Sequence, residues 1–310
     1  MCCRIHNSFT RCTVYFRGVL IMLATALTTL LTNTAPLPPF FVPKEESRGV
    51  KGHAVVDVMS DVGWIGPGQE FHIVVTITPD EGWHTYWENP GDSGSATVIE
   101  IEAPEAYKIG EPIFPRPEIF RSESGTTFGY SELVAIFIPV KAPPTTLDGR
   151  VDFEVATTWF ACRKRCVQGD DKKTLTVSVR TWEEGPLRRS KSLANWRSRL
   201  PKPLEELKEG RARLTGNTLR ITGNTTFRHL GFVGIDHRGV RFMDADMPTF
   251  EDETFTLQVP VNLTPANADG DQFVLEGLLT LGRKSTDPSF LIRIIIDTDS
   301  GPNYYRGDTR

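Results

Sequence analysis

The stretch Val151-Asp-Phe-Glu-Val-Ala-Thr-Thr-Trp159 alternates apolar and polar residues and runs directly toward a cysteine pair, Cys162 and Cys166. After the cysteines, Thr174-Leu-Thr-Val-Ser-Val179 repeats the alternation. Such alternation places one face of a β-strand against a core and the other toward solvent. We therefore expect two strands joined by a turn that holds both cysteines, at one end of a β-sandwich where a partner can reach them.

Other segments with the same alternation lie on both sides of this pair. They are 53–58, 71–78, 97–102 and 133–140 before it, and 218–222, 230–235, 254–260, 273–281 and 290–296 after it. Turns rich in Gly, Pro and Asp separate the earlier segments, as in proteins built of short antiparallel strands. The pattern predicts an all-β fold class, with an immunoglobulin-like antiparallel β-sandwich over residues 49–180 and a second, smaller β-sandwich over residues 211–300.

The segment between these units, residues 181–210, has a different pattern. Its Leu and Trp residues are spaced by three to six positions among many Arg, Lys and Glu residues. This spacing predicts a helical linker of one or two short helices, broken at Pro201 and Pro203.

The first 35 residues predict a secretory signal peptide or an uncleaved N-terminal anchor. Arginines without acidic residues precede an apolar run, 18–31, that is short and threonine-rich for a membrane span. The cleavage site is poorly defined because Pro36 follows Ala35 directly. Residues 36–48 predict a proline-rich linker and residues 301–310 a flexible tail. We expect a periplasmic or otherwise exported protein, either free or tethered by this N-terminal segment.

Net charge and cysteine content limit the partners and the chemistry that we expect. The 310 residues have a formal net charge of −4, so bulk attraction to nucleic acid is not indicated and we expect no nucleic-acid partner. Of the five cysteines, Cys2, Cys3 and Cys12 precede the apolar run. If that run is an export signal, the mature chain keeps Cys162 and Cys166 alone, and in an oxidising compartment these should form a disulfide.

This disulfide could be a redox centre or a structural clip. The spacer Arg163, Lys164 and Arg165 is entirely cationic, and neighbouring positive charge favours thiolate over thiol. A bridge that closes about five residues stabilises by roughly 2 kcal/mol on the chain-entropy model, against ~4.7 for a hundred-residue loop. A zinc site with His53 and His84 is a further alternative, but the spacing does not require it. We expect no metal and no cofactor.

Three motifs together resemble a known family, the periplasmic N-terminal domain of the thiol:disulfide interchange protein DsbD, in its ScsB-like branch. They occur in the family's order over roughly residues 50 to 180. The first motif alone also fits a core strand that enters a tight turn. Residues 211–298 resemble, more weakly, the second β domain of that branch. The three motifs are Gly82-Trp-His-Thr-Tyr-Trp-Glu-Asn-Pro-Gly-Asp-Ser-Gly94, Phe128-Gly-Tyr-Ser-Glu132 and Trp159-Phe-Ala-Cys-Arg-Lys-Arg-Cys-Val-Gln-Gly169.

The resemblance implies an immunoglobulin-like module in which Cys162 and Cys166 are the catalytic redox pair. Such modules receive electrons from a membrane-embedded domain and pass them to periplasmic thioredoxin-like proteins, disulfide isomerases and cytochrome c maturation proteins. An aromatic cap covers the cysteines of the family, and by its motif either Phe128 or Tyr130, on a loop hinged at Gly129, would shield them here, with sulfur about 5 Å from the ring or closer. The alternative is a plain turn whose two aromatic residues pack into the sandwich core.

The sequence departs from the family at its C-terminal end. It reaches Arg310 without the membrane domain or the thioredoxin-like domain that usually follow. We therefore expect the electron donor to be a separate membrane electron carrier, which leaves the direction of electron flow open. The alternative, from a different class, is a non-catalytic β-sandwich binding or scaffold protein in which the disulfide is structural.

Overall fold

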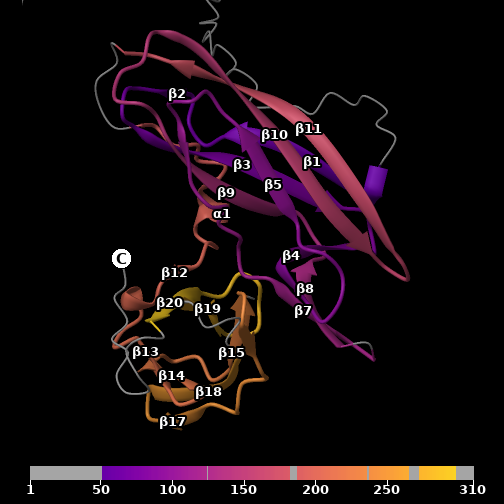
Figure 1. Cartoon of the computed structure of the whole chain (residues 1–310), viewed down its shortest axis with the longest axis vertical. Helices are drawn as coiled ribbons and strands as arrows, with labels where there is room; N and C mark the ends of the chain where they lie inside the picture. Colours follow the sequence, from indigo (N-terminus) through magenta and orange to yellow (C-terminus); the bar gives the residue numbers. More distant parts are fainter. Residues whose placement is uncertain (1–50, 124, 182–186, 236, 265–271, 298–310) are drawn as a thin grey trace, which may run out of the picture. The chain divides into compact units, whose positions relative to one another are not determined.

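The computed structural model describes residues 51–123, 125–181, 187–235, 237–264 and 272–297. The predicted signal or anchor, the proline-rich linker, the C-terminal tail and the first three cysteines lie outside the described residues. Residues 49–310 belong to one compact unit. Nearly all of its elements are strands in antiparallel sheets, which confirms the predicted all-β class (Figure 1). Within the described ranges, no helix has the length and apolar character needed to cross a membrane.

The strands before residue 180 form two sheets, which we call the N-terminal sheets. One has the order β1 (Ala54–Ser60), β3 (Glu70–Pro79), β9 (Val134–Lys141) and β6 (Lys108–Ile109). The other has the order β2 (Trp64–Ile65), β11 (Cys166–Val179), β10 (Gly149–Cys162), β4 (His84–Gly91), β8 (Gly125–Tyr130) and β7 (Glu118–Ser122). A further strand, β5 (Val98–Glu102), also pairs with β10.

The β10–β11 hairpin is the longest pairing in these sheets (Figure 1). Its register runs from Gly149 opposite Val179 to Cys162 opposite Cys166. The alternation seen in the sequence matches the alternation of burial. Phe153, Val155, Thr157 and Trp159 are 0–2% exposed, while the residues that alternate with them are partly exposed. Apolar side chains of β3 and β9 join the same core, so the two sheets pack as a sandwich.

The predicted helical linker contains less helix than its spacing suggested. Its described part has one four-residue helix, α1 (Ala194–Arg197), and one 3₁₀ turn, η2 (Leu204–Glu206). Between them, β12 (Lys202–Pro203) pairs in parallel with β20. Leu193, Leu204 and Leu207 are buried, so the apolar spacing reflects packing of an irregular chain against the sheets.

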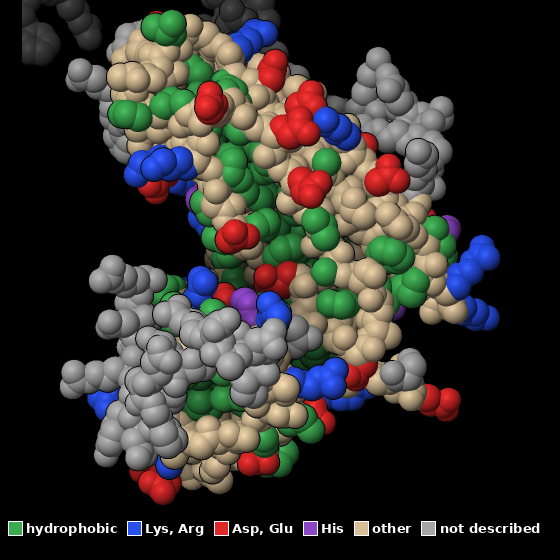
Figure 2. Space-filling model, in the orientation of Figure 1, with side chains coloured by type: hydrophobic (Ala, Val, Ile, Leu, Met, Phe, Trp, Pro, Cys, Tyr) green, Lys and Arg blue, Asp and Glu red, His purple; other side chains and the backbone are tan. Residues whose placement is uncertain are grey.

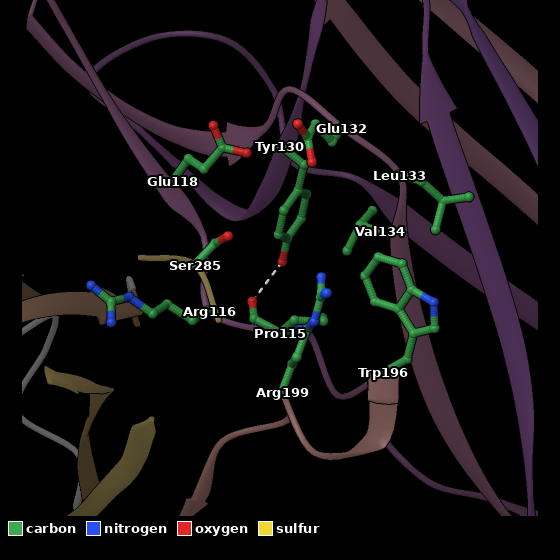
Figure 3. Close-up of a pocket in the computed structure, with 10 residues that line it drawn as sticks. All are labelled: Pro115, Arg116, Glu118, Tyr130, Glu132, Leu133, Val134, Trp196, Arg199 and Ser285. Carbon is green, nitrogen blue, oxygen red and sulfur yellow. Dashed lines mark hydrogen bonds between the residues drawn. The ribbon is translucent and has the colours of Figure 1, made fainter. Parts of the chain in front are cut away.

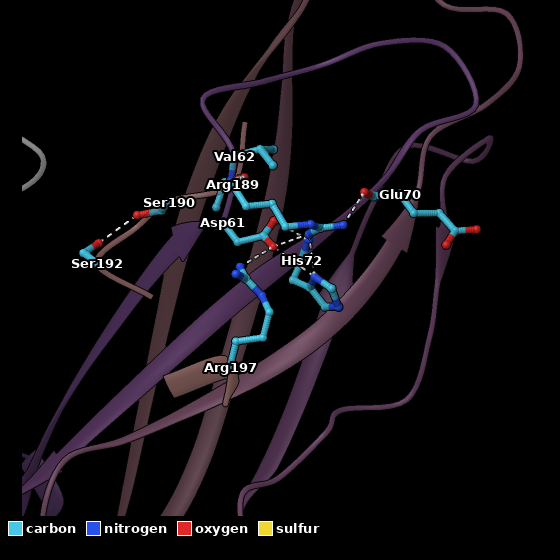
Figure 4. A network of polar contacts seen from close by, with 9 residues as sticks. Asp61, Val62, Glu70, His72, Arg189, Ser190, Ser192 and Arg197 are labelled. Atoms are coloured by element: carbon cyan, nitrogen blue, oxygen red, sulfur yellow. Dashed lines mark hydrogen bonds and ion pairs between the residues drawn. The ribbon is translucent and has the colours of Figure 1, made fainter. Parts of the chain in front are cut away.

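A buried carboxylate fastens this linker to the N-terminal sheets (Figure 4). Asp61 is fully buried and accepts hydrogen bonds from the backbone and ring of His72 at 2.7 and 3.0 Å. Arg197 donates to the same carboxylate at 3.0 Å, and Arg189 donates to it as well. Burial alone would raise the pKa of Asp61, but the His72 hydrogen bonds and the Arg189 charge outweigh it and lower that pKa.

The remaining strands form two further sheets, which we call the C-terminal sheets. One has the order β12, β20 (Ser289–Asp297), β19 (Gln272–Leu281) and β15 (Leu230–Ile235). The other has the order β13 (Arg211–Thr215), β14 (Thr218–Asn224), β18 (Thr254–Leu263) and β16 (Val240–Phe242), and β17 (Thr249–Glu251) also pairs with β18. They share a core of their own, although Val233 and Leu278 belong to the core cluster of the N-terminal sheets.

Candidate functional site

The two cysteines close the last pair of the β10–β11 ladder. Cys162 ends β10, Cys166 begins β11, and a disulfide joins them across a Cα–Cα distance of 4.1 Å. On its other side Cys162 pairs with His84 of β4, so it lies between two strands and is 4% exposed. Cys166 lies at the edge of this arrangement and is exposed. The two halves of the bridge therefore differ sharply in their access to solvent.

Tyr86 of β4 lies directly against the bridge. Its hydroxyl donates a hydrogen bond to Sγ of Cys162 at 3.0 Å and lies 3.6 Å from Sγ of Cys166. The side chain is 3% exposed, and burial raises the pKa of Tyr86 above its usual value. At neutral pH the phenol is therefore protonated and can donate to a sulfur that gains negative charge.

The position of Tyr86 explains part of the motif 82–94. Gly94 has φ 92°, and a Cβ placed there would lie 2.2 Å from Cζ of Tyr86. A larger residue at this position would push the ring away from the sulfur. From the sequence, the motif was interpreted as a core strand or as part of the family resemblance, and Tyr86 was not identified as a site residue. The signal available was a tyrosine in a buried strand, since such a hydroxyl requires a partner.

An aromatic cluster of Tyr86, His84 and Phe120 surrounds this side of the bridge. The imidazole of His84 stacks on Phe120 of β7, with ring centroids 4.5 Å apart, and meets Tyr86 edge-on at 5.4 Å. Burial lowers the pKa of His84, although the charge of Glu118 partly opposes this shift. His84 is therefore a neutral, stacked ring at pH 7.

The structure gives no support to the zinc alternative. His53 stacks on Trp83 at 3.6 Å and bonds to Asp80 at 3.0 Å, and the two sulfurs are bonded to each other. Across the described part of the chain, no group of three or more His, Cys, Asp or Glu residues is arranged to hold a metal ion.

The two residues expected to form the cap lie on strand β8 rather than on a hinged loop. The ring of Phe128 meets Trp87 edge-on, with centroids 6.3 Å apart. Tyr130 is 6% exposed and donates to the backbone oxygen of Pro115 at 2.7 Å (Figure 3). The shallow pocket drawn there, which Tyr130 lines, includes neither cysteine. Shielding of the sulfurs by Phe128 or Tyr130 stays a prediction.

Gly129, between these two aromatic residues, has a role other than a hinge. A Cβ at this position would lie 2.0 Å from the backbone oxygen of Thr85. The glycine therefore allows β8 to approach β4 closely, next to the residue that precedes Tyr86.

The turn between the cysteines carries positive charge outward. Arg163, Lys164 and Arg165 are all exposed, and the backbone of Arg163 donates to the oxygen of Arg165 at 3.3 Å. Figure 2 shows Lys and Arg side chains projecting at this end of the β10–β11 hairpin. A partner that approaches Cys166 meets these charges. Their effect in favour of the thiolate stays a prediction.

These features define a class of protein: a β-sandwich with a short-loop disulfide at the end of a strand hairpin, one half exposed and the other buried against a tyrosine. Residues 55–178 match the family model described as thiol:disulfide interchange protein DsbD, N-terminal. This part of the chain is a DsbD N-terminal-like domain, which confirms the resemblance seen in the sequence. The match and the disulfide together support thiol–disulfide exchange as the class of chemistry.

Comparison with solved structures extends the likeness in fold beyond this domain. The N-terminal periplasmic domain of ScsB from Proteus mirabilis aligns with a TM-score of 0.53 and 18% identity, over 79% of this chain and 93% of that chain. At this identity the likeness concerns the fold alone. The N-terminal domain of Neisseria meningitidis DsbD in its reduced form aligns over 43% of this chain and 90% of that chain, with 12% identity. Its TM-score of 0.25 is too low for conclusions about the fold. No curated protein sequence matches the chain.

Proposed function

We propose that this protein is an exported thiol–disulfide oxidoreductase of the protein-disulfide reductase type, which relays reducing equivalents through Cys162 and Cys166 to periplasmic partner proteins. The observation that supports this most directly is the asymmetry of the bridge. Cys166 is exposed, whereas Cys162 is 4% exposed and accepts a hydrogen bond from Tyr86. Attack on a disulfide needs one accessible sulfur and one sulfur that leaves as a stabilised thiolate, and the bridge supplies both.

The first half of the cycle reduces the bridge. A thiolate of the donor attacks Sγ of Cys166, the Cys162–Cys166 bond breaks, and Cys162 leaves as a thiolate that the Tyr86 hydroxyl stabilises. A mixed disulfide now joins the donor to Cys166. The second thiolate of the donor attacks its own sulfur in that bond, so Cys166 leaves. Two electrons have passed to the bridge, the donor is oxidised to a disulfide, and both product thiolates can take up protons from solvent.

The second half is the reverse reaction on another protein. The Cys166 thiolate attacks a disulfide of the partner and forms a mixed disulfide with it, and the other partner sulfur leaves as a thiolate. Cys162, held in register beside Cys166, then attacks Cys166 and releases the reduced partner. The bridge is restored and no cofactor is consumed.

The partners follow from this chemistry and from the family. The donor would be a membrane electron carrier, and the acceptors would be thioredoxin-like proteins or disulfide isomerases, including those of cytochrome c maturation. The exposed charges of Arg163, Lys164 and Arg165 would guide a partner with an acidic surface toward Cys166. Opposite charges on such surfaces increase the association rate more than the affinity, and salt weakens the effect.

The ladder around the bridge weakens the alternative of a purely structural disulfide. Every residue of β10 from Gly149 to Cys162 already has a register partner on β11. Closing the last pair covalently adds only the entropy of a short loop, about 2 kcal/mol. A stabilising clip would be more effective between segments that the sheet does not already hold together.

Trapping with single-cysteine variants tests the proposal. Cys162→Ser leaves the exposed Cys166 thiol without its resolving partner, so it should accumulate a mixed disulfide with a thioredoxin-like protein. Cys166→Ser leaves the buried thiol and should accumulate little. Mass spectrometry of the blocked mixtures measures both. A native bridge that stays oxidised below about −300 mV in a redox titration, or equal trapping by the two variants, would contradict the proposal.

A further inference from the structure

Strand β4 contacts both the disulfide and the C-terminal sheets. Tyr86 on this strand donates to Sγ of Cys162 at 3.0 Å. Three residues later, Nδ2 of Asn89 donates to the backbone oxygen of Gly234 at 2.7 Å. Asn89 is 7% exposed, and Gly234 lies on β15. One strand therefore links the C-terminal sheets to the hydrogen-bond donor of the sulfur.

The pairing of β4 with β8 is interrupted between Tyr86 and Gly91, the stretch that contains Asn89. Tyr86 pairs with Gly129, the next pair is Gly91 with Thr127, and the register shifts between them. Such a bulge leaves part of a strand without ladder partners on that side. The course of β4 just after Tyr86 must therefore be fixed by other contacts.

The side-chain amide of Asn89 supplies two of those contacts. Its Oδ1 accepts a hydrogen bond from the backbone N–H of Gly91 at 3.0 Å, inside the irregular segment. Its Nδ2 donates across to Gly234 of β15. A buried amide with both ends bonded fixes the backbone on each side of it, because losing either bond leaves a buried polar group unpaired.

Apolar side chains of the C-terminal sheets also pack against the core next to Tyr86. Trp87, which follows Tyr86 directly, is fully buried in the core cluster of the N-terminal sheets. Val233 of β15 and Leu278 of β19 are 1% exposed and belong to that cluster. The core beneath β4 is thus completed by side chains from the C-terminal sheets.

A second polar contact reaches the other strand of the aromatic cluster. Arg116 is 8% exposed and donates to the backbone oxygens of Leu281 at 2.6 Å and Gly282 at 2.9 Å. It shortly precedes β7, whose Phe120 stacks on His84. The C-terminal sheets therefore bond to the chain near both strands that form the cluster.

We propose that the C-terminal sheets position the Tyr86 hydroxyl against the disulfide through strand β4, with Asn89 as the positioning residue. This inference rests on the proposed exchange function and assigns the C-terminal sheets a part in it. Asn89 acts on the bridge through Tyr86: it fixes the backbone that aims the phenol, and the phenol stabilises the leaving Cys162 thiolate.

A double-mutant cycle on the full chain tests this proposal. The readout is the rate at which dithiothreitol reduces the bridge, followed by mass spectrometry after acid quenching. We expect Asn89→Ala to slow reduction about threefold and Tyr86→Phe roughly 10- to 150-fold, the range expected for loss of a hydrogen bond to a charged group. In the Tyr86→Phe background, Asn89→Ala should have no further effect, because the hydroxyl that it aims is already gone.

The control is Arg189→Met, which weakens the hydrogen-bonding of Asp61 and lowers stability away from β4. Its reduction rate should match that of the wild type. An unchanged rate for Asn89→Ala, or an equal effect of Asn89→Ala with and without the Tyr86 hydroxyl, would overturn the proposal. A slower rate in the control as well would also overturn it, because slower reduction would then follow from lost stability in general.

A second variant keeps the test decisive if Asn89→Ala does not fold. Leu278→Ala perturbs the same junction from the C-terminal sheets and should slow reduction only while the Tyr86 hydroxyl is present. Failure of the proposed function gives a different result: the wild-type bridge itself would then resist dithiothreitol, whatever residue stands at position 89.

Discussion

The hydroxyl of Tyr86 donates a hydrogen bond to Sγ of Cys162 across 3.0 Å, from a position 76 residues earlier in the chain. The sulfur that receives this bond belongs to the buried cysteine, and the exposed Cys166 lies beside it. This pairing sets a direction for the chemistry, because stabilising one sulfur as a thiolate favours attack on the other.

Removing this hydroxyl should slow opening of the bridge. We expect Tyr86→Phe to reduce the rate with dithiothreitol roughly 10- to 150-fold, since a hydrogen bond to a charged group contributes roughly 1.5–3 kcal/mol. Tyr107→Phe is the matched control, because Tyr107 is a partly buried tyrosine that packs on Phe153 at 5.2 Å. Quenched-flow reduction of both variants measures the difference, and identical rates would remove Tyr86 from the mechanism.

The cap expected from the family has a separate test. If the ring of Phe128 or Tyr130 shields the sulfurs, Phe128→Leu or Tyr130→Leu should speed reduction by dithiothreitol severalfold, because the exchange rate depends on access. Leucine removes the ring while keeping much of the apolar volume, which limits the loss of stability. The thermal midpoint of each variant checks that limit. If neither rate rises, shielding by these two residues is wrong.

Glu88 should make stability fall as pH rises. Burial, then the charges of Glu276 and Glu111, raise the pKa of Glu88 to about 8. The folded protein therefore holds this proton where the unfolded chain has lost it, so folding stability declines between about pH 4.5 and pH 8 and is level above that. The shift corresponds to roughly 5 kcal/mol at most. Urea titrations at a series of pH values measure the free energy of unfolding of the wild type and of Glu88→Gln. Over this window that free energy should fall less steeply with pH in the variant. Parallel pH dependences would contradict the assignment.

The buried carboxylate of Asp61 should make folding stability fall as pH decreases, the opposite of the effect of Glu88. Because its pKa is lowered in the folded state, Asp61 contributes stability above its unfolded pKa and loses it as pH falls through the folded value. Arg189→Met removes one partner of the buried carboxylate and should cost about 1–3 kcal/mol. It should also move acid unfolding to higher pH. Arg188→Met, at the exposed neighbouring arginine, should change neither quantity in the same acid titration.

The sequence predicted those strands whose own alternation matches their burial. The expected strand 151–159 lies inside β10, and the expected strand 230–235 coincides with β15. By contrast, β11 begins at Cys166 rather than at Thr174. Its first residues are mostly polar, and they are extended because β10 pairs with each of them. A strand that is extended because a neighbouring strand pairs with it need not alternate apolar and polar residues in its own sequence. This also explains why β7 and β17 were not expected.

The candidate site was predictable only in part. The cysteine pair follows from its spacing and its place between two strands, and the structure has it as a disulfide. Tyr86 was not predictable as a site residue, because its partner lies on a strand far along the chain. The same holds for Asn89, whose carbonyl partner, Gly234, is 145 residues away. Such contacts depend on how the sheets pack, which alternation alone does not specify.

The β10–β11 ladder has a consequence for the lifetime of any covalent complex. The ladder continues to Ala161 opposite Val167, next to the bridge, so these backbones stay paired when the sulfurs separate. The freed thiol thus remains at a high effective concentration beside its former partner, and effective molarities for well-aligned groups are very large. Ring closure should then outpace diffusion of any competing thiol. A mixed disulfide on Cys166 would be short-lived in the native protein, which favours rapid turnover over stable capture.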